Sequence, residues 1–270
     1  MYESFFGLEH SPFQISPDPE FLYPSAVHDE ALRHLRYSLN YFKGTCLVTG
    51  PVGSGKTTIC RQIIRELDPE SVDHALVLNP RLGELELLAH ILTDLGEVVE
   101  SWEGLVWQVQ RVILERHAAG RHVVILVDEA QVMPNESLEV LRLLTNLETR
   151  DAKLVQVVLF AQPEFETRLA QDPELLPLRH RILVQCRLAP LKYDETMSYI
   201  RHRVAVAGGS GQRVSFSALA GRAIHRWSEG MPRLINHLCD KALMSAYVRQ
   251  DRKVKFGDAR RARRDVGALL

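Results

Sequence analysis

The residues from Gly50 to Thr57 carry the strongest chemical signal in this 270-residue chain. They fit the pattern G-x-x-x-x-G-K-[ST], follow the apolar run TCLVT and open a segment with helical periodicity. Glycines let the backbone form a concavity whose N–H groups bind phosphate, together with the positive end of the following helix. An ordinary glycine-rich turn is the alternative. The pattern predicts these nucleotide-binding residues: Gly50, Pro51, Val52, Gly53, Ser54, Gly55, Lys56, Thr57 and Thr58.

Two residues of this loop and two acids further on predict a hydrolytic reaction. Lys56 is expected to contact the β- and γ-phosphates, and the Thr57 hydroxyl to ligate Mg²⁺. Asp128 and Glu129 end the apolar run HVVILV, and open α/β sheets bind ligands at the carboxyl ends of their strands. Asp128 is expected to bind Mg²⁺ directly or through water, and Glu129 to orient and polarise the attacking water. A solvated acidic turn is the alternative, which the phosphate loop upstream disfavours.

Five strand-sized apolar runs alternate with helical patterns along most of the chain. Such an alternation predicts an α/β fold with a five-stranded, mostly parallel sheet buried on both faces. The expected strands are 45–49, 74–79, 122–128, 153–160 and 181–188. The expected helices between and before them are 28–42, 57–67, 82–95, 105–118, 136–148 and 164–170.

The strand signal ends near residue 192, and three helical segments follow at 194–207, 217–228 and 232–249. A small all-helical domain is therefore expected after the sheet. The first residues form a proline- and aromatic-rich arm, which we expect to be pinned to a surface by its aromatics. The predicted organisation is an arm and helix packed on the core (1–43), an α/β core (44–190) and a helical lid with a basic end (191–270).

Composition limits the classes of protein that this chain can be. With 46% hydrophobic and 25% charged residues, it is neither a disordered chain nor a fibre or coiled coil. Its four cysteines form no C-x-x-C pair, so we expect buried thiols in a reducing compartment rather than a zinc site or disulfide framework. The apolar runs are too short to span a bilayer and the N-terminus lacks a signal-peptide pattern, so a cytoplasmic location is expected.

Several motifs together resemble the AAA+ ATPases. These are the phosphate loop, the Asp-Glu pair, a strand ending in a polar residue, arginines before the last strand and a helical lid with GMPR. Within that family, FFGLEHSPFQISPDPEFLYPSAVHDEAL, DEAQ, LRLLTNLET, FAQPEFETRL and GMPRLINHLCDKAL resemble the ExeA/GspA branch of secretion- and pilus-associated ATPases. The resemblance covers essentially the whole chain and implies a P-loop fold that uses ATP and Mg²⁺.

The resemblance also implies roles for single residues. Gln162 matches the sensor-1 position, which would hydrogen-bond the γ-phosphate or the water, although most AAA+ proteins carry Asn, Ser or Thr there. Asn79 matches the residue that in many relatives holds the catalytic glutamate inactive; a strand-end turn is equally compatible with it. Arg233 matches sensor 2, a lid arginine that reaches the phosphates, with a surface helix-start arginine as the alternative.

By the same resemblance, Arg179 or Arg181 is the arginine finger that a subunit presents to its neighbour's γ-phosphate, and Arg181 is favoured. A finger acting in trans implies a homo-oligomer, either a ring or a helical assembly. Phe21, Leu22, Tyr23 and His28 are implied to lie near the adenine; simple packing of the arm is the alternative.

The net charge of −1 conceals an uneven distribution. The run from Arg249 to Arg264 carries eight basic and two acidic residues, hence +6, which leaves −7 for the remainder of the chain. Such a run could contact nucleic acid or anionic lipid, but a solvated terminal helix is the favoured interpretation.

Two functions fit these observations. The first is a Mg²⁺-dependent ATPase that supports assembly of a cell-envelope machine for secretion, pili or polysaccharide export. It would act in the cytoplasm or at the inner membrane through a protein partner. The second, less favoured function is a DNA-binding ATP switch resembling transposition regulators or replication initiators. Longer members of the branch add a membrane helix and a peptidoglycan-binding domain, so this chain is expected to resemble the short soluble relatives.

Overall fold

The computed structural model describes residues 2–99, 101–149, 153–209 and 214–267. The chain divides into two compact units, each built from segments distant in sequence. One unit comprises Asp29–Val52 and Ile59–Leu188; the other comprises Met1–His28, Gly53–Thr58 and Ala189–Leu270. The boundary after Leu188 lies close to the predicted end of the α/β core. The phosphate loop and the first 28 residues, however, group with the helical part.

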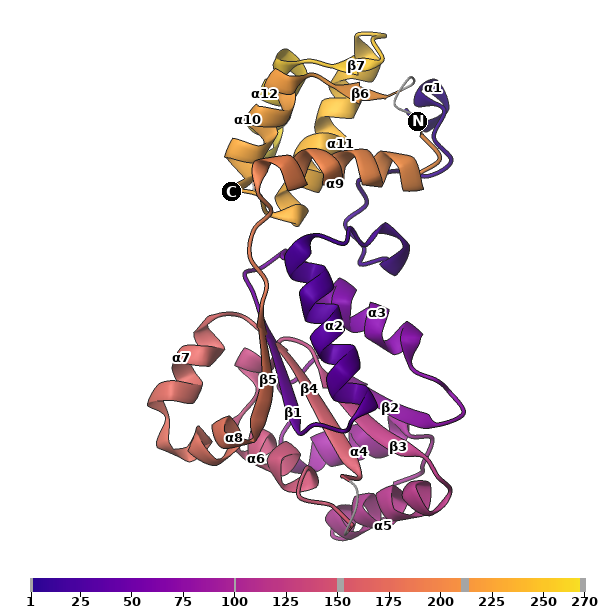
Figure 1. Ribbon diagram of the computed structural model, residues 1–270, viewed down its shortest axis with the longest axis vertical. Coiled ribbons are helices and arrows are strands. Elements are labelled where there is room, and N and C mark those ends of the chain that lie inside the picture. Colours follow the sequence, from indigo (N-terminus) through magenta and orange to yellow (C-terminus); the bar gives the residue numbers. More distant parts are fainter. Residues whose placement is uncertain (1, 100, 150–152, 210–213, 268–270) are drawn as a thin grey trace. The chain divides into compact units, whose positions relative to one another are not determined.

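The first unit contains the predicted sheet (Figure 1). Its strands lie in the order β2-β3-β4-β1-β5, and every neighbouring pair is parallel, which confirms the expected α/β fold. The strands are β1 (Thr45–Thr49), β2 (Val72–Val77), β3 (His122–Val127), β4 (Val155–Ala161) and β5 (Ile182–Arg187). The central strands β1 and β4 are buried at every residue, as expected for strands covered on both faces.

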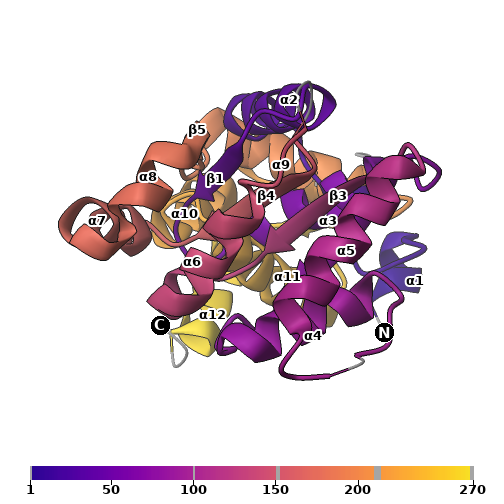
Figure 2. The same ribbon diagram turned by 90° about the horizontal axis from the view of Figure 1, so that it is seen from below.

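Helices cover both faces of this sheet. Figure 2 shows α2 on one side and α4, α5 and α6 on the other. Buried side chains such as Leu47, Ile125 and Val157 form one core cluster with α4 to α8. On the opposite face, the Ser38 hydroxyl of α2 accepts from the Gln156 amide at 2.8 Å. The helices and 3-10 turns are α2 (Ala26–Asn40), α3 (Lys56–Glu66), α4 (Glu84–Asp94), α5 (Leu105–Ala118), η2 (Ala130–Val132), α6 (Asn135–Leu144), α7 (Glu164–Gln171), η3 (Pro173–Leu175) and α8 (Leu176–Arg181).

The second unit contains more structure than the three helices expected after residue 192. A fourth helix and a short parallel strand pair join them. Three buried apolar residues of the basic run, Val254, Ala259 and Ala262, pack in this unit, as does Val266 just after the run. The elements are α1 (Glu3–Phe6), η1 (Pro19–Phe21), α9 (Tyr193–Val206), β6 (Ser215–Phe216), α10 (Ala218–Ser228), α11 (Pro232–Val248), β7 (Lys253–Val254) and α12 (Phe256–Val266).

The aromatic arm belongs to the core of this second unit. Phe6, Phe13 and Phe21 are buried in one cluster with residues of α9, α10, α11 and α12. The sequence predicts an arm packed on the α/β core, and the arm's contacts differ from that prediction. The reason is a set of contacts between residues far apart in the sequence. The buried guanidinium of Arg203 on α9 donates to the Pro12 and Gln14 carbonyls and lies over the Phe21 ring.

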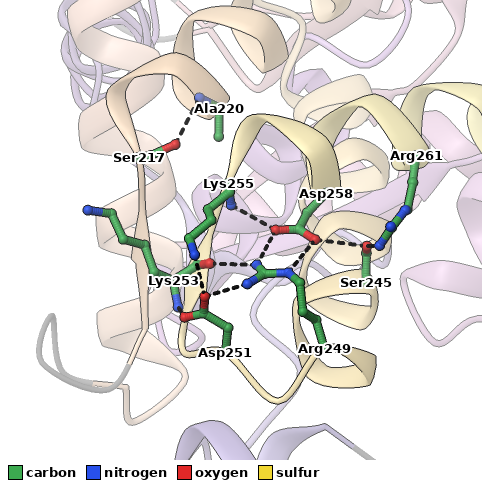
Figure 3. Close-up of polar contacts among 9 residues, drawn as sticks. All are labelled: Ser217, Ala220, Ser245, Arg249, Asp251, Lys253, Lys255, Asp258 and Arg261. Carbon is green, nitrogen blue, oxygen red and sulfur yellow. Dashed lines mark hydrogen bonds and ion pairs between the residues drawn. The ribbon is translucent and has the colours of Figure 1, made fainter.

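The basic run forms β7 and α12, and Figure 3 shows its polar contacts. The sequence favours a solvated terminal helix, whereas one face of α12 is buried in the second unit. Arg249 pairs with Asp258 at 2.6 Å and also with Asp251, which in turn pairs with Lys255 at 2.8 Å. Asp258 is 1% exposed, and it caps α12 by accepting from the Lys255 N–H at 2.8 Å. Burial opposes ionisation of Asp258, but the bond from Arg249 and the other contacts lower its pKa overall. Part of the positive charge of the basic run is therefore neutralised by ion pairs within this unit.

Two further expectations concern thiols and membranes. All four cysteines are free and buried, as predicted, and burial raises the pKa of Cys46 and Cys186 to about 11. Across the described ranges, no helix has the length and apolar character needed to cross a bilayer.

Arg203 anchors the arm and gives a test of this fold. Its guanidinium donates to Pro12 O at 2.6 Å and to Gln14 O at 3.0 Å, and it lies 4.4 Å from the centre of the Phe21 ring. Arg203→Ala would remove the charged donor to the buried Pro12 carbonyl and the cation–π contact with Phe21, so the free energy of unfolding should fall by about 3 kcal/mol in urea titrations. Arg201→Ala, at an exposed site two residues away, is the control; equal stability of both variants would contradict this role.

Candidate functional site

The phosphate loop has the conformation that its sequence predicts. It leaves β1 at Gly50, whose N–H donates to Ala161 O at 3.2 Å. Gly53 and Gly55 have φ angles of +80° and +100°, a region that L side chains rarely adopt. Helix α3 starts at Lys56, which is only 5% exposed. The loop therefore presents a helix N-terminus and a largely buried lysine.

The loop also fits the group that it is expected to hold. The Ser54 hydroxyl is buried and has no hydrogen-bond partner. A buried polar atom left unpaired is costly, and a phosphate oxygen is a suitable acceptor for it. Gly55 lies close to the His28 ring, because a Cβ at this position would lie 3.0 Å from His28 Nε2.

Two residues from distant parts of the chain meet this loop within the second unit. The Arg233 N–H donates to Gly53 O at 3.3 Å, and a Cβ at Gly53 would lie 2.6 Å from Arg233 Cβ. Arg233, the expected sensor 2, therefore starts α11 directly against the loop. Gly230, two residues before α11, lies against the Leu191 backbone: its φ is +76°, and a Cβ there would lie 2.1 Å from Leu191 O.

His28 makes the second contact. Its Nε2 lies 2.8 Å from Ser54 O and its Nδ1 lies 2.6 Å from Ser25 Oγ. Because a carbonyl oxygen only accepts, Nε2 carries the hydrogen and Ser25 donates to Nδ1, which is the neutral ring. Burial lowers the pKa of His28, against the effect of the Ser54 carbonyl. The ring therefore braces the loop in its neutral form.

The other three arm residues expected near the adenine make packing contacts in the second unit. Phe21 is buried beneath the Arg203 guanidinium, and the Tyr23 ring lies edge-on to Tyr199 with centroids 5.9 Å apart. Leu22 lies between them and is half-buried. These contacts agree with the packing alternative for Phe21 and Tyr23.

The acid pair follows β3 at the carboxyl edge of the sheet. Asp128 is 4% exposed, its N–H donates to Val77 O at 2.9 Å, and its carboxylate accepts the Glu129 N–H at 2.9 Å. Glu129 has φ +55° and ψ +37°, a left-handed conformation that is uncommon for a residue with a side chain. The chain thus turns sharply after Asp128 and directs the two acids differently.

Gln162 and Glu129 are brought together. Gln162 follows β4, the strand between β3 and β1, and its amide nitrogen donates to Glu129 Oε2 at 3.0 Å. The residue expected as sensor 1 therefore contacts the residue expected to orient water. Asn79, in contrast, is exposed two residues beyond the end of β2.

Two contributors to this edge are absent from the sequence-based assignment. Gln131 donates to Glu129 Oε2, and its side-chain oxygen accepts the Gln162 N–H at 3.0 Å. Glu166 on α7 binds the Thr49 hydroxyl, at the end of β1, together with Arg187 at the end of β5. Burial would raise the pKa of Glu166, but the bonds from Arg187 and Thr49 lower it overall. The only signal for Gln131 in the sequence is its position, since it is a polar residue two positions after Glu129.

The two candidate fingers lie at the end of α8. Arg179 is exposed, whereas Arg181 is half-buried. The pKa of Glu148 is lowered chiefly by its bond with Lys153 and further by the charge of Arg181. Both arginines therefore lie on the surface segment that leads into the edge strand β5.

His28 makes the bracing of the loop dependent on pH. An unfolded histidine takes up a proton near pH 6.5, while the folded ring does so only at lower pH, so stability is lost as pH falls below about 6.5. Urea unfolding at pH 7.5 and 5.5 should show a smaller loss for His28→Gln than for wild type, by up to about 1 kcal/mol. His10→Gln, at an exposed site, is the control. Equal losses for wild type and His28→Gln would contradict the buried neutral ring.

Comparisons with known proteins agree with this geometry. The family model "AAA domain" matches residues 39–169. Over its whole length the chain is 43% identical to "General secretion pathway protein A" of Aeromonas hydrophila, and it spans 49% of that protein.

Solved structures share the fold at lower identity. The Aeropyrum pernix ORC2 protein is 15% identical, with a TM-score of 0.68 over 93% of this chain and 72% of that one. The Thermotoga maritima RuvB Holliday junction branch migration motor is 18% identical, with a TM-score of 0.61 over 91% of this chain and 70% of that one. Together these findings show an AAA domain over residues 39–169, in a chain that resembles General secretion pathway protein A over its whole length.

Proposed function

We propose that this protein binds ATP with Mg²⁺ and hydrolyses its γ-phosphate. The observation that carries the proposal is the contact of Glu129 with Gln162 at the carboxyl edge of the sheet. Strand β4 pairs with β1, the strand that leads into the phosphate loop, so its carboxyl end lies beside that of β1. Gln162, which contacts Glu129, therefore follows the strand next to β1, the strand that leads into the phosphate loop.

The proposed roles follow the chemistry of each side chain. The loop N–H groups and Lys56 hold the phosphates, and Arg233 adds a guanidinium from the start of α11. Thr57 and Asp128 supply oxygen ligands, the type that Mg²⁺ takes, and the bound ion neutralises developing phosphate charge. Glu129 orients the attacking water and accepts its proton, while Gln162 hydrogen-bonds the water or the γ-phosphate.

A complete site requires a neighbouring subunit under this proposal. Arg179 or Arg181 of one subunit stabilises the transition-state charge at the site of the next, and elsewhere such fingers contribute about 10³–10⁵ in rate. The exposed end of α8 supports this role, since both side chains are at the surface of their unit. The proposed active form is a ring or helical homo-oligomer.

The proposed biological role is support of cell-envelope assembly or secretion, through a partner protein at the inner membrane. The similarity of this whole chain to 49% of a protein named for general secretion supports it. The alternative of a DNA-binding ATP switch is supported by the basic run and by the fold likeness to the ORC2 protein and the RuvB Holliday junction branch migration motor, at 15–18% identity. That likeness concerns the fold alone.

Two substitutions separate binding from hydrolysis. Lys56→Ala should abolish binding of a fluorescent ATP analogue, because it removes the cation that contacts the β- and γ-phosphates. Glu129→Gln should keep that binding but lower the rate of phosphate release by about 10²-fold or more. Equal turnover by wild type and Glu129→Gln would refute the assigned base.

Mixed assemblies test the finger in trans. Arg181→Ala and Lys56→Ala subunits should each be inactive alone, and mixing them should restore part of the turnover. The reason is that an intact arginine can then face an intact phosphate loop. Mixing Lys56→Ala with Glu129→Gln is the control and should restore none. Recovery with Arg179→Ala instead of Arg181→Ala would move the role to Arg179.

A further inference from the structure

Glu129 is held by two glutamines rather than one. The Gln131 amide nitrogen lies 2.5 Å from Glu129 Oε2, and the Gln162 amide nitrogen lies 3.0 Å from the same oxygen. Gln131 also uses its other end, because its Oε1 accepts the Gln162 N–H at 3.0 Å. One side chain therefore joins the turn after β3 to the end of β4.

The backbone under Glu129 requires such support. A non-glycine residue in the left-handed region costs roughly 1–3 kcal/mol and persists only where its surroundings hold it. The turn that follows is short: Val132 N–H donates to Glu129 O at 3.1 Å, and Met133 N–H to Ala130 O at 3.2 Å. Both of these bonds lie within the turn, so contacts from other elements help to keep Glu129 in its left-handed conformation.

Arg168 on α7 supplies those contacts. Its Nη1 donates to Gln131 O at 3.2 Å and to Met133 O at 2.8 Å, and its Nη2 donates to Asn135 Oδ1. A charged donor that binds several carbonyls makes stronger hydrogen bonds than a neutral one. The guanidinium thus holds the middle and the C-terminal end of the turn that carries Gln131.

The contacts continue to the segment that carries the candidate fingers. The Asn135 amide donates to Asp172 at 2.9 Å and to Glu174 at 2.8 Å, in and beside the turn η3. The bond from Asn135, together with other contacts, lowers the pKa of Asp172. Helix α8, which bears Arg179 and Arg181, begins directly after η3.

We propose that Gln131 is a positioning residue for Glu129, and that Arg168 holds it in register with the α8 segment. The inference rests on the proposed role of Glu129 in hydrolysis. Gln131 sets the direction of the carboxylate, and Gln162 sets its distance from β4. Engagement of α8 by a neighbouring subunit then reaches Glu129 through Asn135, Arg168 and Gln131.

The test removes the donor without removing the volume. Gln131→Glu keeps an acceptor for the Gln162 N–H but replaces the donor to Glu129 with a second carboxylate, whereas the neutral Gln131→Met removes both the donor and the acceptor. Each should lower kcat by about tenfold with the KM for ATP and the binding of a fluorescent ATP analogue unchanged within about twofold. Arg168→Gln should lower kcat by a smaller factor in the same manner. Gln171→Met, at an exposed site on α7, is the matched control and should leave kcat unchanged.

Each outcome decides a separate point. Thermal melting identifies a variant that loses kcat by unfolding, and the isosteric Gln131→Glu provides the second measurement. Wild-type or raised kcat in both Gln131 variants, with Glu129→Gln inactive, would overturn the inference alone. Wild-type turnover in Glu129→Gln would overturn the proposed function and the inference together.

Discussion

Parallel pairing of β3, β4 and β1 is the constraint on which the candidate site depends. It brings the carboxyl ends of three strands to one edge, and a different functional group follows each of them. The phosphate loop follows β1, Asp128 and Glu129 follow β3, and Gln162 follows β4. Residues separated by more than 100 positions become neighbours only because the strands stay in register. A substitution that disrupts the buried apolar residues of these strands would therefore displace all of these groups together.

The backbone at Glu129 is strained, and hydrogen bonds from neighbouring side chains offset that strain. Glu129 is left-handed, and the hydrogen bonds of Gln131, Gln162 and Arg168 stabilise it. The phosphate loop shows a parallel case, since Gly53 and Gly55 have positive φ and are braced by Arg233 and His28. In both places residues distant in sequence hold a short segment in a conformation it would not keep alone. This is how a fold prepares a site before the substrate arrives.

Sequence patterns predicted the parts of this structure that depend on local or periodic information. Five apolar runs indicated the sheet, and G-x-x-x-x-G-K-[ST] placed the loop between β1 and α3. Helix α12 was missed as part of the packed unit, because the spacing of Ala259, Ala262 and Val266 is hidden among arginines. The arm's location was missed because it depends on contacts with α9, some 190 residues away. Gln131 was missed for a similar reason, since its bonds require the left-handed turn at Glu129, which no spacing rule predicts.

The most direct test of this account is a crystal structure of the full chain with Mg²⁺ and a non-hydrolysable ATP analogue. The account predicts that the Glu129 carboxylate and the Gln162 amide both lie within hydrogen-bond reach, about 3 Å, of a water in line with the γ-phosphate. Gln131 should still contact Glu129 in that structure. A triphosphate bound in the loop, with Glu129 directed away and another side chain placed at that water, would contradict the central claim.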